Sequence, residues 1–223
     1  MTLRLLTMFI VIALSIDVIA EDHQLKVVKT APKGLSKAIA ANLNPNGYRI
    51  TAGNGPVCDF WMLKSVALKP GFKETFSIKY PFTPGQLIGA LQVSKGIEFT
   101  DFRGQVVDPG VYTLRYGHQP EDGNHIGTAD IVDFLMAVPA KLDTDPKTIK
   151  DLEKLMKTSG KSVGATHPAI FSLQTIDEKI EKTELSHDED HDFWILNFNA
   201  NGKAKDKKVK VSMRLVAIGQ SSE

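Results

Sequence analysis

Alternation of apolar and polar residues with a period of two is the feature that most limits what this chain can fold into. It is clearest in residues 208–218, where Val209, Val211, Met213 and Leu215 would share one face. Lysine, serine and arginine would occupy the other face, as in an antiparallel strand with one buried and one solvated side. Such a strand must bury its apolar face against a second layer, so the pattern predicts a layered β protein.

The alternation recurs along the chain. Residues 193–198 form a second such strand, and residues 199–202 with a basic run join the two as a predicted hairpin. Residues 57–65 are apolar on both sides, which predicts a central strand. Further strands are expected over residues 24–29, 48–52, 72–82, 86–93, 97–102, 111–116, 131–138 and 169–176.

Two short helices interrupt the strands. Residues 35–43 carry leucine and isoleucine at helical spacing. Residues 145–158 have Asp145 as a candidate cap, Pro146 at the first helical position and Gly160 to close the end. We therefore expect an all-β, antiparallel β-sandwich, cupredoxin- or immunoglobulin-like, with two short helices and a single domain over residues 21–223.

The first twenty residues are typical of a signal peptide. Arg4 supplies the positive charge, and residues 5–16 are apolar but shorter than the roughly 20 residues that a membrane-spanning helix needs. Cleavage is expected after Ala20, so that the mature chain begins at Glu21 and has no integral membrane segment. We expect the mature protein to be either periplasmic or secreted. The single cysteine, Cys58, excludes an internal disulfide and is expected to be a small core residue.

The net charge of the chain bears on which kinds of binding partner to expect. The formal net charge of +1 gives no reason to expect nucleic acid, whereas a protein partner or a small ligand stays open. The basic run at residues 203–210 is expected to be a solvated hairpin tip, with an anionic partner as the alternative.

The polar segment 117–133 is the candidate site, because it follows a strand and contains imidazoles and carboxylates. His118 and His125 are the candidate metal ligands within it, and the further ligands would come from Asp122, Asp133 or the more distant His167. Imidazole and carboxylate together suit a divalent metal such as Zn or Cu. The alternative is that the segment satisfies its own hydrogen bonds and binds nothing.

Residues 109–127 resemble the copper loop of plastocyanin-like cupredoxins. That loop needs a cysteine thiolate, and here Gly117 stands before His118 with no cysteine nearby. The resemblance therefore implies a cupredoxin-like strand and loop and not a type-1 copper centre.

A broader resemblance covers about residues 48–173. The motifs VCDFW, PGVYTLRYG, QPEDGNHIGTA, DFLMAVPA and GATHPAIFSL resemble a group of uncharacterised exported bacterial β-rich proteins. The resemblance implies location and fold class but no activity.

The sequence therefore predicts an exported binding or structural module whose polar His/Asp loop holds a metal or small ligand. One alternative is a metal-dependent hydrolase that uses the same loop, and another is an envelope-complex component with no site. Catalysis is not favoured, because no nucleophile motif, phosphate loop or dinucleotide fingerprint occurs. The segment 187–192, HDEDHD, is expected to be a solvated loop.

Overall fold

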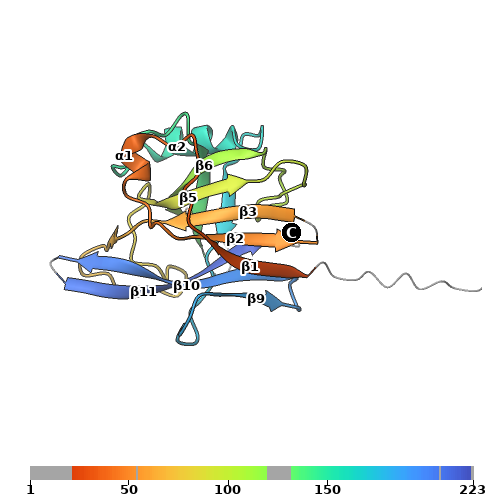
Figure 1. Cartoon of the computed structure of the whole chain (residues 1–223). Coiled ribbons are helices and arrows are strands. Elements are labelled where there is room, and N and C mark those ends of the chain that lie inside the picture. The colour runs from red at the N-terminus through yellow and green to blue at the C-terminus, as the bar shows by residue number, and fades with distance from the viewer. Residues whose placement is uncertain (1–21, 54, 120–131, 206, 222–223) are drawn as a thin grey trace, which may run out of the picture.

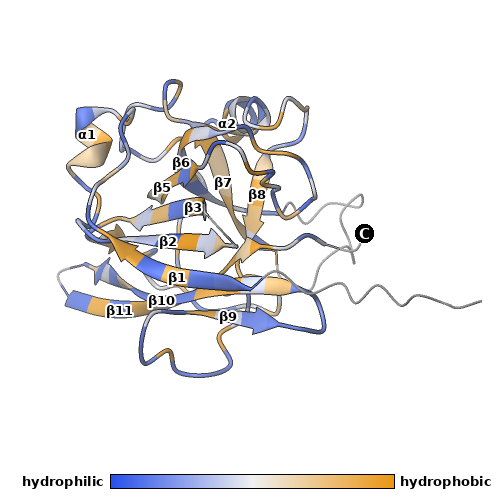
Figure 2. Ribbon diagram, turned by 45° about the vertical axis from the view of Figure 1, so that its right-hand side comes forward, coloured by the Kyte–Doolittle hydropathy of each residue, from blue (hydrophilic) through white to orange (hydrophobic). Residues whose placement is uncertain are grey.

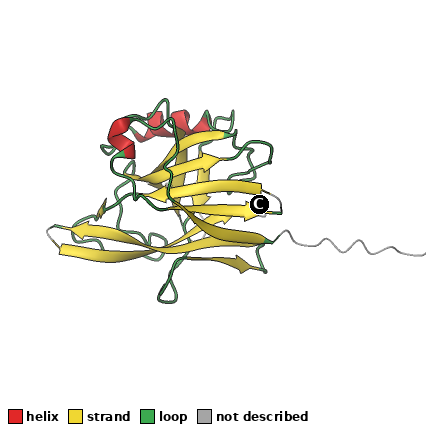
Figure 3. Cartoon of the chain, in the orientation of Figure 1, coloured by secondary structure: helices red, strands yellow, loops and turns green. Residues whose placement is uncertain are grey.

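The fold consists of two β-sheets packed face to face, with two helices outside (Figures 1 and 3). The computed structural model describes residues 22–53, 55–119, 132–205 and 207–221. The elements are β1 (His23–Val28), α1 (Lys37–Ala40), β2 (Gly47–Ala52), β3 (Gly55–Met62), β4 (Val66–Ala67), β5 (Leu87–Val93), β6 (Gly110–His118), β7 (Asp133–Pro139), α2 (Leu152–Gly160), β8 (Ala169–Ser172), β9 (Glu184–Asp188), β10 (Phe193–Ala204) and β11 (Lys207–Ile218). The prediction of an all-β, antiparallel sandwich with two helices is confirmed.

The larger sheet is a seven-stranded antiparallel meander in the order β1-β2-β3-β5-β6-β7-β8. The smaller sheet is built on the β10–β11 hairpin. The strand β9 pairs with the first half of β10, and β4 pairs in parallel with its far end. The predicted central strand is confirmed, because β3 lies between β2 and β5.

The core lies between the two sheets and is made by the alternate residues that the sequence pattern selects. Tyr112, Leu114 and Tyr116 of β6 face Phe198 and Met213 of the hairpin layer within one cluster of buried side chains. Figure 2 shows β7 and β8 mostly in the hydrophobic colour, as expected for strands buried on both faces.

The edges of the larger sheet meet the smaller one. Strand β1 lies against β9, and β8 lies against β11, where Leu173 bridges to Leu215. The Tyr80 hydroxyl strengthens the second junction, because it donates to the Gln174 carbonyl and accepts from the Arg214 N–H.

The second helix begins later than expected. Asp151 caps α2 by accepting a hydrogen bond from the Lys154 N–H, whereas Asp145 lies in a turn and accepts from the Lys147 N–H. The Asp145 carbonyl accepts from the buried Arg115 guanidinium, which holds this segment away from a helical path.

Two predicted strands are wrong. Over residues 72–82 Tyr80 and Phe82 are buried, but Phe76 is 86% exposed and no strand forms. The backbone N–H groups of Ile78 and Lys79 donate to side chains of Thr75 and Asp133 instead of a neighbouring strand. Residues 97–102 make a single bridge at Thr100.

The hairpin is confirmed but longer than expected, because residues 199–202 continue β10 and do not form the turn. The expected loop at residues 187–192 also begins inside a strand, because His187 and Asp188 belong to β9. Within the described ranges, no helix is long and apolar enough to cross a membrane.

Candidate functional site

The candidate site lies where β6 ends and β7 begins. His118 is the last residue of β6, and it pairs in register with Asp133, the first residue of β7. The polar segment therefore leaves and re-enters the sheet at two adjacent, fixed positions. Loops held in this way by a rigid sheet are frequent binding sites.

Buried hydrogen bonds anchor Asp133. One carboxylate oxygen accepts from the Tyr116 hydroxyl and the other accepts from the Lys79 N–H at 2.6 Å. Burial raises the pKa of the Asp133 carboxyl above its ordinary value, although these donors and the nearby His118 act in the opposite direction. Asp133 is 1% exposed, so it supports the strand ends and is not an open ligand.

His118 is half-buried and has one ring nitrogen near a backbone acceptor. Its Nδ1 lies 3.3 Å from the Gln119 carbonyl oxygen. A ring that donates from Nδ1 to a carbonyl keeps the lone pair on Nε2, which is the arrangement of most metal-ligating histidines. His118 is therefore suited to accept a ligand proton or to coordinate a metal through Nε2.

The other predicted ligands are not all near His118. Asp122 and His125 lie outside the described residues. His167 is exposed and precedes β8, whose first residue Ala169 pairs with Ala137 of β7. That pairing is four residues along β7 from Asp133, about 13 Å at the usual rise of a strand. The structure thus places His118 and His167 at opposite ends of β7 and does not bring them together.

No preformed metal centre exists among residues 22–53, 55–119, 132–205 and 207–221, because no three His, Cys, Asp or Glu side chains converge there. This includes the segment 187–192. There the His187 ring stacks on Trp194 with 4.4 Å between ring centroids and pairs with Asp192, while His191 pairs with Asp188.

Cys58 faces the core from β3 and is fully buried, as the sequence predicted. Burial raises the pKa of its thiol well above the ordinary value, and the neighbouring Asp59 raises it further. The reactive thiolate is therefore strongly disfavoured.

A buried ion pair that the sequence did not predict links β6 to the segment after β7. Arg115 is 0% exposed, and its Nε and Nη2 donate to the two oxygens of Asp143, each at 2.7 Å. The remaining donors reach the carbonyls of Gly85, Asp145 and Lys147, so all five guanidinium N–H groups are paired. The signal available in the sequence was a charged residue, Arg115, at an alternating position of a predicted strand. A candidate partner, Asp143, lies in the turn-rich segment after the next strand.

No protein-family model, curated protein sequence or solved structure matches this chain.

Proposed function

We propose that the protein is an exported binding module that holds a divalent metal or small ligand where β6 passes into β7. The observation that carries the proposal is the position of His118, whose Nδ1 lies 3.3 Å from the Gln119 carbonyl oxygen. A histidine that donates from Nδ1 to a backbone carbonyl ligates through Nε2. The buried Asp133 network beneath it supplies a rigid base. Asp122 and His125 are the proposed partners of His118, from the segment between the two strands.

The proposal favours binding over catalysis. The buried ionisable groups near this end of the sheet are committed to structural hydrogen bonds, as at Asp133 and at the Arg115–Asp143 pair. A carboxylate already occupied in this way is poorly placed to exchange protons with a substrate.

A metal-binding experiment tests the site. The purified protein is analysed for bound metal and then titrated with Zn²⁺ by calorimetry. One equivalent of metal is expected to bind, and His118→Ala with His125→Ala is expected to abolish it. His167→Ala is the matched control, because the same change is made at an exposed histidine at the other end of β7.

Two results would contradict the proposal. Zinc affinity that is equal in the double variant and the parent would place any metal elsewhere. A loss of zinc binding in His167→Ala alone would show that the β7–β8 end is the site. Export is tested separately by N-terminal sequencing of protein recovered from the cell envelope or the medium, with Glu21 as the expected first residue.

A further inference from the structure

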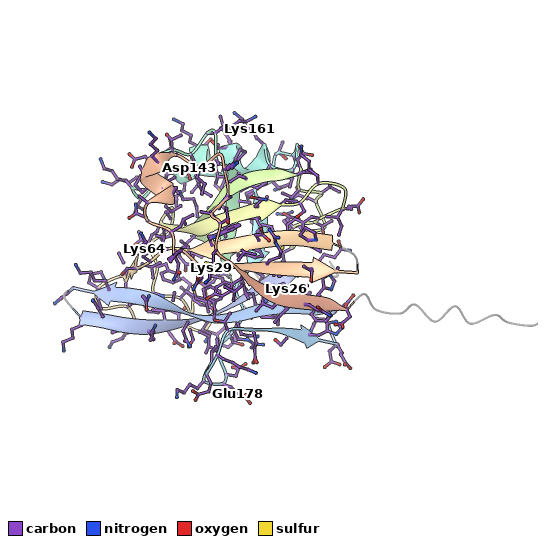
Figure 4. The ribbon with its side chains drawn as sticks, viewed as in Figure 1. Lys26, Lys29, Lys64, Asp143, Lys161 and Glu178 are labelled. Atoms are coloured by element: carbon purple, nitrogen blue, oxygen red, sulfur yellow. The ribbon has the colours of Figure 1, made fainter. Side chains whose placement is uncertain are left out.

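The far end of the β10–β11 hairpin carries lysines that the proposed function does not use. Lys203 and Lys208 lie directly opposite each other in the register, and Lys210 lies opposite Asn201. Lys64, from the connection between β3 and β4, lies beside this end of the hairpin (Figure 4).

These side chains line an open groove of about 670 Å³. The described residues that line it are Lys64, Ser65, Asn201, Gly202, Lys203, Lys208, Val209 and Lys210, and none of these carries a carboxylate. A groove that offers ammonium, hydroxyl and amide donors without an acidic group is complementary to an anion.

Two of the ammonium groups are held in place by neutral acceptors. Lys64 Nζ donates to the Ala41 carbonyl at 2.8 Å, and Lys210 Nζ donates to Asn201 Oδ1 at 2.6 Å. Each uses one of its three N–H donors in these bonds, which leaves two for a ligand. Elsewhere on the described surface lysines do pair with carboxylates, as Lys157 does with Glu153.

The opposite end of the same strand is acidic. Residues 177–192, which precede β10, contain eight Asp or Glu and two Lys, whereas residues 203–210 contain five Lys and one Asp. Glu178 marks the acidic side in Figure 4, away from Lys64. This charge separation would orient the molecule with the hairpin end toward an anionic surface.

A structural role for the lysines explains only part of the pattern. No strand in the described part of the chain pairs with the outer edge of β11 over its first half, and lysines on a free edge prevent pairing with other chains. This accounts for Lys208 and Lys210 but not for Lys64 or Lys203, which lie on other elements. Facing lysines also repel each other, which weakens the hairpin that they would protect.

We propose that this lysine groove docks on a membrane surface by binding the phosphate groups of anionic phospholipids. A surface is favoured over a small anion because the groove is open, the hairpin projects beyond the ends of β2 and β3 (Figure 1), and Val209 is 38% exposed among the lysines. An apolar side chain within a basic patch suits the interface between headgroups and acyl chains. This surface is separate from the His118 end and goes beyond the function proposed above.

Vesicle sedimentation tests the proposal. The chain from Glu21, which holds every described strand, is mixed with vesicles of phosphatidylcholine alone or with an equal part of phosphatidylglycerol. Binding is expected only to the anionic vesicles, and it should weaken as salt shortens the Debye length to about 8 Å at physiological ionic strength. Each lysine near such a surface contributes about a fivefold change in affinity. The double variant Lys203→Gln, Lys208→Gln is therefore expected to bind about 25-fold more weakly.

The matched control is Lys154→Gln with Lys161→Gln, which changes the net charge equally at exposed lysines of and beside α2. An equal loss in the control would show that net charge and not the groove is responsible, and would overturn the proposal. Complete displacement by inorganic phosphate would assign the groove to a small anion instead of a surface. Unchanged vesicle binding with new self-association of the Lys203, Lys208 variant would leave edge protection as the role of these lysines.

Discussion

Removing the carboxylate of Asp143 is expected to destabilise the protein more than almost any other polar substitution. Asp143→Ala would leave Nε of Arg115 without an acceptor, and Nη2 with the Asp145 carbonyl alone, in a site where the side chains are 0% and 4% exposed. The Thr113 hydroxyl, which also donates to Asp143, would keep only the long contact of 3.4 Å to the Val138 carbonyl. Breaking a buried ion pair by removing one member typically costs about 3–5 kcal/mol, because an uncompensated charge stays in a low-dielectric site.

Urea unfolding followed by tryptophan fluorescence measures this cost, since Trp61 is buried in the folded chain. The expected loss of about 3–5 kcal/mol corresponds to a fall in Tm of roughly 6–20 °C for a domain of this size. Glu153→Ala is the matched control. It breaks a salt bridge of similar length, 2.6 Å, whose side chains are 73% and 75% exposed, and it should leave the free energy of unfolding unchanged within error.

A cost of less than about 1 kcal/mol for Asp143→Ala, the scale of an ordinary exposed pair, would contradict this prediction. That result would mean that Arg115 readily finds another acceptor and that residues 141–151 are not held by it.

Three further predictions concern packing and ionisation. Gly47→Ala should cost about 1–3 kcal/mol in denaturant unfolding, because its Cβ would lie 2.4 Å from the Trp61 Nε1, whereas Gly55→Ala meets nothing within 4 Å and serves as control. Phe82→Ala should lower the free energy of unfolding by about 3–5 kcal/mol and Phe76→Ala by less than about 0.5 kcal/mol. Equal losses would contradict this difference in burial and favour the strand that the sequence predicted over residues 72–82, with both side chains on its buried face. Burial raises the pKa of Tyr80, Tyr112 and Tyr116, to about 12 for Tyr112. Alkaline titration should therefore show no tyrosinate absorbance from these three residues until the chain unfolds. Because an unfolded tyrosine ionises near pH 10, stability should be lost as the pH rises above that value; early ionisation would contradict the burial of Tyr80, Tyr112 and Tyr116.

Much of the fold could be predicted because the hairpin layer and β6 have faces of opposite polarity. In such strands a local pattern determines which residues enter the core. The segment 72–82 has the same pattern and is not a strand, since alternation does not show where the backbone N–H groups find acceptors. Lys79 donates to Asp133, 54 residues away, and no local rule anticipates that contact.

The candidate site was predictable only in part for the same reason. The end of β6 at His118 follows from alternation and from the polar residues that come next. The distance between His118 and His167 depends on the register between β7 and β8, and no local sequence signal specifies that register. Likewise the polar face of β6 did not reveal that Arg115 is buried, because the segment that covers it comes from residues 141–151.

The C-terminal strands β9 and β11 lie against the two edges of the larger sheet, β1 and β8, and this arrangement affects the order of folding. The meander from β1 to β8 forms by pairing of strands close in sequence, but its core face packs against buried residues of β10 and β11, such as Phe198 and Met213. Synthesis from the N-terminus therefore delivers the cover last, after the surface that needs it. Joining β1 to β9 spans most of the chain, and such non-local contacts make folding slow. A chain that stops before β10 would keep the meander's pairing partners yet expose its apolar face to other chains, so such a fragment is expected to aggregate.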